Sequence, residues 1–234
     1  GGGNTGIGHD TLRSNTSGSH NTGIGDKSLD SNTTGTRNTA IGEDSLGNNT
    51  TANFSVAAGY QALGQNTTGS SNVAVGAQAL GANVTGTGNT AVGRSCLQNN
   101  TGSNNTSFGN RALFINTTGI DNVAVGANAL DANTTANSNT AVGKSALGTN
   151  TTGAQNVAVG AAAFDASTTS SNCVAIGHNA LTTQTAANDN VAVGKDALKL
   201  NTTGASNTAL GKDSLESNTT ASNNTAVGVT AFQS

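Results

Sequence analysis

The stretch NTAVGKSALGTNTTGAQ, residues 139–155, decides the fold because it recurs with small changes along the whole 234-residue chain. The glycine at its fifth position, here Gly143, returns every 17 residues, except that Gly93 and Gly109 are 16 residues apart. The repeats leave no linker and no second domain. The sequence therefore predicts a single repeat domain of fourteen coils over residues 1–234.

Each position of the repeat, counted from this corner glycine, forms a column of related residues. The residue two before the glycine is Gly, Ala or Ser, and the residue three before it is Thr or Val. The fourth residue after the glycine is always Leu or Phe. This last column predicts a structural core: Leu12, Leu29, Leu46, Leu63, Leu80, Leu97, Leu113, Leu130, Leu147, Phe164, Leu181, Leu198, Leu215 and Phe232.

Asparagine occupies the seventh position after the corner glycine in most repeats, where it opens an Asn-Thr-Thr-Gly turn. Stacked identical amides can hydrogen-bond from one coil to the next. We therefore expect an Asn ladder of Asn15, Asn32, Asn49, Asn66, Asn83, Asn100, Asn116, Asn133, Asn150, Asn201 and Asn218. Some of the same residues match the Asn-x-Ser/Thr acceptor of N-glycans, a pattern that the repeat itself generates.

The period and its residue types indicate an all-β protein. Seventeen residues are too few for a helical hairpin, and alternating β-branched and small residues are typical of a strand. Gly and Asn tolerate the positive φ angles of turns. We expect a parallel β-solenoid whose coil consists of a short strand, a Gly corner, a second short strand and a broader polar turn.

Both faces of the expected strand are restricted in composition. The large apolar column before the glycine points one way, and the Ala column beside it points the other. One face can line the interior of the coil, whereas a solvated face would vary freely. The other face therefore needs a cover, and a second copy of the chain is the simplest one, which predicts a homo-oligomer.

Composition narrows the class of function. Charged residues make up 9% of the chain and aromatic residues 3%, against about 25% charged residues in ordinary soluble domains. The formal net charge of −3 leaves no basic excess for nucleic acid. No apolar run approaches the ~18 residues of a membrane span, so we expect none in this chain.

Candidate chemical groups do not cluster in the repeat. His9 and His178 share a column that elsewhere holds acidic, basic, aromatic and small residues, and His20 lies in the outer turn, so none has a fixed partner. The acids of the second position after the glycine are too sparse for a metal. We expect no enzyme, no catalytic residue, no metal and no cofactor. Cys96 and Cys173 lie five coils apart, which excludes a disulfide between them.

The shortened repeat is followed by an unusual apolar pair, Phe114-Ile115. Exposed apolar pairs can mark interaction sites, so this pair is a candidate interaction patch. The alternative is that the pair fills the gap left by the missing residue in the neighbouring coil.

The repeat also resembles known surface proteins. Residues 72–76 and 190–194, Asn-Val-Ala-Val-Gly, resemble the head repeat of YadA-type trimeric autotransporter adhesins, whose repeat is shorter. Residues 139–155 are similar to the arrays of phage tail-fibre and long surface-fibre proteins. The resemblance implies a left-handed β-roll in a homotrimer, displayed extracellularly on a cell or a virion.

The leading functional hypothesis is a rigid shaft or head segment of an extracellular adhesive fibre, which attaches to a surface receptor or glycan. One alternative is an ice-binding solenoid that uses rows of threonine such as Thr67-Thr68 and Thr117-Thr118. Another is a matrix fibril that grows by end-to-end stacking of exposed solenoid edges.

Overall fold

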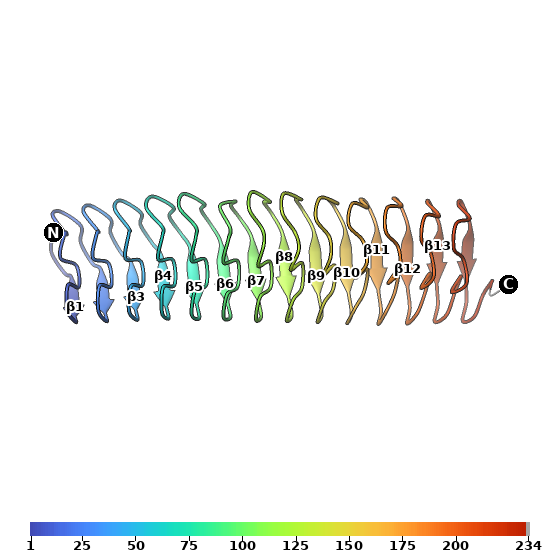
Figure 1. The fold of residues 1–234 in the computed structure, drawn as a ribbon, viewed down its shortest axis with the longest axis horizontal. Helices are drawn as coiled ribbons and strands as arrows, with labels where there is room; N and C mark the ends of the chain where they lie inside the picture. The colour runs from blue at the N-terminus through green and yellow to red at the C-terminus, as the bar shows by residue number, and fades with distance from the viewer. Residues whose placement is uncertain (233–234) are drawn as a thin grey trace. The chain divides into compact units, whose positions relative to one another are not determined.

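The computed structural model describes residues 1–232 and is an all-β parallel β-solenoid with coils of about 17 residues and one strand in each repeat (Figure 1). The contacts divide the chain into two compact units, Gly1–Gly119 (unit 1) and a second that starts at Ile120 (unit 2). In residues 1–232 no helix has the length and apolar character needed to cross a membrane.

Unit 1 contains seven strands of three residues, each hydrogen-bonded in parallel to the next along the chain. Equivalent repeat positions pair, so that Ile24 lies opposite Ile41. The strands are β1 (Thr5–Ile7), β2 (Thr22–Ile24), β3 (Thr39–Ile41), β4 (Val56–Ala58), β5 (Val73–Val75), β6 (Thr90–Val92) and β7 (Thr106–Phe108).

Unit 2 repeats this arrangement with seven further strands in parallel register. Val125 pairs with Val142, and Ala158 pairs with Ala175. The strands are β8 (Val123–Val125), β9 (Thr140–Val142), β10 (Val157–Val159), β11 (Val174–Ile176), β12 (Val191–Val193), β13 (Thr208–Leu210) and β14 (Thr225–Val227).

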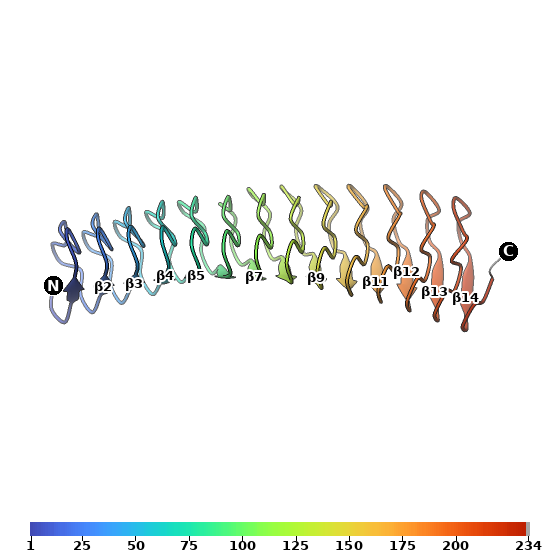
Figure 2. The ribbon, with the colours of Figure 1, turned by 60° about the horizontal axis from the view of Figure 1, so that its bottom comes forward.

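The small middle residue of each strand faces the interior of the coil. Ala40, Ala74 and Ala141 have no exposed surface, whereas the residues on either side of them in each strand are partly or largely exposed. This follows from the alternation of side chains along a strand. Figure 2 shows the strands of unit 1 lying beside one another on one side of the coils. The larger apolar column therefore faces outward.

The expected second strand is absent from the coils of residues 1–232, and this prediction was wrong. After the corner glycine the chain makes successive tight turns: the Ser28 N–H donates to the Gly25 carbonyl, and the Asp30 N–H to the Lys27 carbonyl, both at 3.3 Å. The third residue of each turn has a left-handed backbone, with φ of 54° at Lys27 and 53° at Leu29. A left-handed residue at every second position prevents an extended strand.

The corner itself requires glycine. Gly25 has a φ of 128°, which residues with a side chain rarely adopt, and a Cβ there would lie 2.7 Å from the carbonyl group of Gly42 in the next coil. Successive corners therefore stack too closely for any side chain.

The Leu/Phe column fills the interior beside the small strand residues. Its members from Leu29 to Leu215 are buried, and Phe164 is the largest of them. The two end members differ from the predicted core. Leu12 is half-buried, and Phe232 is 66% exposed because it lies in the last coil that the structure describes, with no further coil packed over it there.

Candidate functional site

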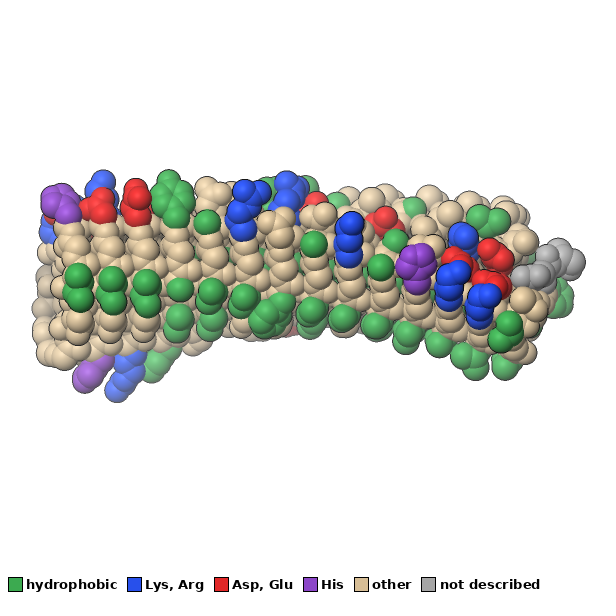
Figure 3. Space-filling view, turned by 90° about the horizontal axis from the view of Figure 1, so that it is seen from below, with side chains coloured by type: hydrophobic (Ala, Val, Ile, Leu, Met, Phe, Trp, Pro, Cys, Tyr) green, Lys and Arg blue, Asp and Glu red, His purple; other side chains and the backbone are tan. Residues whose placement is uncertain are grey.

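The outward face of the sheet carries the most regular surface feature of each unit. We call the residue before each corner glycine the strand-face column. In unit 1 its members include Ile7, Ile24 and Ile41, whose exposed fractions are 60%, 37% and 45%. Figure 3 shows hydrophobic side chains repeating from coil to coil in unit 1.

The full strand-face column consists of apolar residues. In unit 1 it is Ile7, Ile24, Ile41, Ala58, Val75, Val92 and Phe108, and in unit 2 it is Val125, Val142, Val159, Ile176, Val193, Leu210 and Val227. Neighbouring strands lie about 4.7–4.9 Å apart, so each unit presents a continuous apolar strip. Strips of this kind usually mark protein interfaces, whereas single exposed apolar residues do not.

The predicted Asn ladder lies inside the coils. In unit 1 the Asn49 side-chain amide donates to Asn32 Oδ1 at 2.7 Å, and Asn83 donates to Asn66 Oδ1 at 2.9 Å. Each ladder residue also holds its own turn closed, as Asn66 does by donating to the Gly69 carbonyl at 3.0 Å. In unit 2 the Asn218 amide donates to Asn201 Oδ1 at 2.8 Å. The ladder joins the coils and closes the polar turn.

Gln184 extends the ladder where the sequence has no asparagine, because its side-chain oxygen accepts from Asn201 at 3.0 Å. One interruption of the ladder lies within unit 1 and another within unit 2. Asn83 Oδ1 and Asn150 Oδ1 are buried and accept no hydrogen bond. After Asn150 the column holds Ser167, whose shorter side chain makes no hydrogen bond either. After Asn83 comes the shortened repeat.

A second Asn column, four residues before the corner glycine, has a role that the sequence did not reveal. Asn38 donates to the Ala52 carbonyl at 2.7 Å, and its Oδ1 accepts from the Ser55 backbone N–H at 3.0 Å. Just before most strands, the backbone N–H donates to the side-chain oxygen of one of these asparagines rather than to a backbone carbonyl, as the Ser55 N–H does to Asn38 Oδ1. Both Asn columns are buried, so a glycan on Nδ2 would displace these hydrogen bonds.

The two threonines of each pair in the polar turn have different roles. The first hydroxyl donates to a backbone carbonyl of the next coil, as Thr33 does to Thr50 at 3.0 Å and Thr151 to Thr168 at 2.9 Å. The second threonine, such as Thr34, is exposed. Each turn that has such a pair therefore presents one threonine side chain to solvent, because the hydroxyl of the other threonine is bound.

The candidate chemical groups lie apart on the surface. His9 Nδ1 is 3.2 Å from Asp26 Oδ1, and His20 Nδ1 is 3.2 Å from Ser19 Oγ. His178 lies at an exposed corner. No group of three His, Cys, Asp or Glu side chains that could hold a metal occurs among residues 1–232.

One carboxylate in unit 2 is strongly perturbed by its neighbours. Lys195 Nζ lies 2.8 Å from Asp196, Asn179 donates to it at 3.2 Å, and Lys199 Nζ is 3.4 Å away. The bond from Lys195 is the main reason that the pKa of Asp196 falls to about 2. The carboxylate is held by lysines, which indicates a structural ion-pair network at the corner.

The two cysteines are free and buried. Burial raises the pKa of the Cys96 thiol, and burial likewise raises that of Cys173. Both thiols therefore stay protonated and unreactive at neutral pH.

The Phe114-Ile115 pair is split between two environments. The Arg111 guanidinium carbon lies 4.2 Å from the centroid of the Phe114 ring, and Phe114 is half-buried. Ile115 is 39% exposed. Arg111 thus covers one member of the candidate interaction patch and leaves Ile115 at the surface.

Comparisons with protein-family models, with curated proteins and with solved structures find no match for this chain.

Proposed function

We propose that this chain is a structural segment of an extracellular adhesive fibre, in which identical copies pack together through the strand-face column. The observation that carries the proposal is that the core is already filled by Leu and Ala columns, yet a second apolar column repeats outside it. Such a strip is not needed to fill the core of a single chain, and its uniformity suits contact with a surface that has the same period.

The energetics support self-association. Complete burial of one Val, Leu, Ile or Phe side chain stabilises an assembly by about 1.5–3 kcal/mol, and each coil except that of Ala58 offers one such residue, already partly buried. The residue three before the corner glycine, such as Thr22 or Val73, flanks it on the same face. A second copy of the chain presents the same strand-face column, with the same spacing between residues, so the two columns can pack against each other along their length.

The resemblance to trimeric adhesin heads and surface fibres favours a left-handed homotrimer displayed on a cell or a virion. A fibre of this kind provides rigid display, and its polar turns face outward to contact a receptor or a glycan. The role requires no enzyme chemistry and no cofactor, in keeping with the scattered titratable groups on the surface.

The mass of the particle tests the proposal. Light scattering on the intact chain is expected to give about three times the 22.7 kDa chain mass. The double variant Ile24→Lys/Ile41→Lys should lower this mass, while the matched control Thr34→Lys/Thr51→Lys, in the polar turns of the same unit, should leave it unchanged. A folded parent particle of one chain mass would overturn the proposal.

An ice-binding role is the second candidate, because the exposed threonines Thr34, Thr51 and Thr68 recur in three successive coils of unit 1. Only one row is free, since the hydroxyl of the first threonine donates to the next coil. A thermal-hysteresis measurement decides between the two roles, and we expect no hysteresis.

A further inference from the structure

Unit 1 contains a shallow trough with a volume of about 190 Å³. Four glutamine side chains line it, Gln61, Gln65, Gln78 and Gln98, together with small residues that include Gly64 and Gly81. Because all of these residues belong to three successive coils of one unit, the trough is complete within a single chain.

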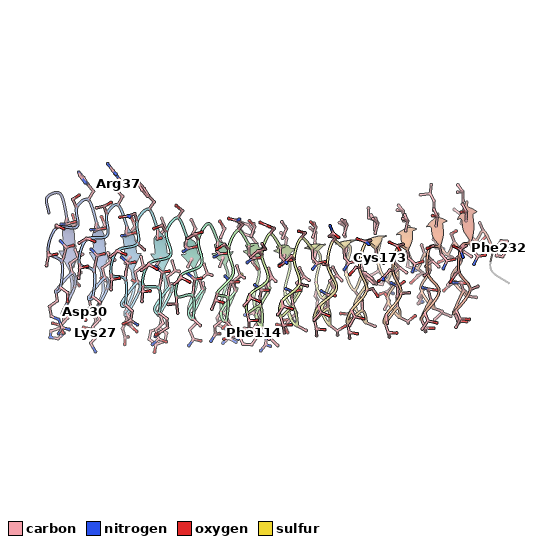
Figure 4. The ribbon with its side chains drawn as sticks, turned by 90° about the horizontal axis from the view of Figure 1, so that it is seen from above. Lys27, Asp30, Arg37, Phe114, Cys173 and Phe232 are labelled. Carbon is pink, nitrogen blue, oxygen red and sulfur yellow. The ribbon has the colours of Figure 1, made fainter. Side chains whose placement is uncertain are left out.

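Three successive coils lack a side chain at the fifth position after the corner glycine, and the trough lies over the last two of them. Gly47, Gly64 and Gly81 occupy this position, where Asp30, Asp131 and Asp165 stand in other coils. Figure 4 shows Asp30 and Phe114, which share this column, projecting along one edge of unit 1. The three glycines leave that edge without side chains, and Gly64 and Gly81 line the trough.

The chemistry of the lining is neutral and rich in hydrogen-bonding groups. Gln61 donates to Asp44 Oδ2 at 3.3 Å, whereas the side-chain amides of Gln65, Gln78 and Gln98 have no partner in the described part of the chain. Each amide offers two donors and one acceptor oxygen. No charged residue lines the trough, so an ionic ligand would lose its water without gaining a counter-charge.

The backbone of the trough cannot pair with an added peptide strand. The Gln65 N–H donates to the Gly81 carbonyl at 3.1 Å, and the Ala82 N–H donates to the Gln98 carbonyl at 2.8 Å. Peptide recognition by strand addition needs free backbone donors and acceptors, and these groups are occupied. Recognition must therefore come from the side-chain amides.

We propose that this glutamine trough binds a neutral sugar ring, such as a hexose of a surface glycan. Sugar hydroxyls are both donors and acceptors, which matches the amides, and the trough is smaller than the about 300–1,000 Å³ of ordinary ligand pockets, which limits it to one ring. The inference rests on the proposed adhesive function and gives it a contact site. One site binds weakly, and several copies in a fibre raise avidity about 10²–10⁴-fold.

Saturation-transfer NMR on the intact chain tests the proposal, with the methyl glycosides of glucose, galactose and mannose and with N-acetylglucosamine as probes. Each is titrated to about 50 mM, above the millimolar Kd expected for a few neutral hydrogen bonds. At least one probe should bind. The variant Gly81→Asp, which fills the trough with the residue found at the same position in Asp131 and Asp165, should weaken binding at least tenfold.

The control Gln155→Ala removes an exposed glutamine in unit 2 and should leave sugar binding unchanged. The melting temperature and particle mass of both variants should match those of the parent. Binding of none of these sugars, equal binding by Gly81→Asp, or binding confined to sialyllactose or an extended peptide would overturn the proposal. If the chain forms a multi-chain particle that binds no sugar, only the sugar-binding proposal is wrong. If the chain is a monomer that binds sugar, only the proposed assembly into a fibre is wrong.

Discussion

Two successive ladder steps in unit 1, one regular and one shortened, show which parts of a coil tolerate a change in length. In the regular step, Asn83 donates to Asn66 Oδ1 at 2.9 Å and to the Gly86 carbonyl three residues ahead. In the shortened step, Asn100 donates to the Gly102 carbonyl only two residues ahead, and Asn83 Oδ1 has no partner.

The strand and the core are unaffected by the same deletion. Strands β6 and β7 keep their register, with Val92 opposite Phe108, and Leu97 and Leu113 are both buried. The missing residue is therefore removed from the polar turn, at the expense of one ladder hydrogen bond. The corner glycine and the core column determine the register, and the turn adapts to it.

The largest loss of stability is expected when a deletion is too long for the polar turn to accommodate. Deletion of residues 127–134 removes half a coil from unit 2 and shifts the core and Asn columns out of register, which should abolish cooperative unfolding. Deletion of residues 127–143 removes one whole repeat and preserves register, so the melting temperature should stay within about 5 °C of the parent value. Differential scanning calorimetry checks both variants. A stable half-coil deletion beside an unfolded whole-coil deletion would refute the coil assignment.

The next largest effect is the difference in stability loss between a substitution in the core column and one at the exposed corner. Leu130→Asp places a carboxylate in a fully buried site and should destabilise the fold by more than about 3 kcal/mol, although Asp tolerates the φ of 50° at this position. Lys144→Asp, at an exposed corner, should change the free energy of unfolding by no more than about 0.5 kcal/mol. Urea denaturation measures both values, and similar losses would show that the inner and outer columns are assigned wrongly.

The sequence predicted the solenoid, the strand before each corner glycine and a Leu/Phe column that is buried from Leu29 to Leu215, because all three depend on side chains that repeat every coil. It did not predict the turns that replace the second strand, since Ala-Leu beside polar residues resembles an alternating strand pattern. A signal was present: among residues 1–232 the columns with positive φ contain no Val or Ile, and Thr230 is their one β-branched member. β-Branched residues would be strained there.

The sequence also left open which strand face lies inside, because both faces are restricted. Packing decides it: the interior beside the Leu column has room only for Gly, Ala or Ser, so the larger apolar residue points outward. The glutamine trough was equally hidden, since it depends on glycines in neighbouring coils rather than on a motif within one repeat.

A smaller effect is expected within the Asn ladder itself. Asn66→Ala removes a donor to Asn49 Oδ1, a bond to Gly69, and the acceptor of the Asn83 amide. Asn83→Ala removes no such acceptor, because Asn83 Oδ1 has no partner. Asn66→Ala should therefore destabilise unit 1 by about 1 kcal/mol more than Asn83→Ala. Equal losses in urea denaturation would mean that the interruption of the ladder has no energetic consequence.

The smallest effect concerns a corner, where sequence changes are best tolerated. The pKa of Asp196 is about 2 in the folded chain, against about 3.9 in an unfolded one. Its contribution to stability is therefore present above pH 4 and lost as the pH falls toward 2. In a pH series of thermal melts, Asp196→Asn should flatten this part of the curve relative to the parent. An unchanged slope would show that the lysine contacts do not stabilise the fold.

Disulfide trapping between copies tests the central claim, that the strand-face column is an interface between identical chains. Ile24→Cys lies in the column and Thr34→Cys in the polar turn, and the native cysteines are buried. Under mild oxidation, Ile24→Cys should give a covalent two-chain product on a non-reducing gel, and Thr34→Cys should remain a single chain. A single chain from Ile24→Cys, or equal trapping at both positions, would contradict the account.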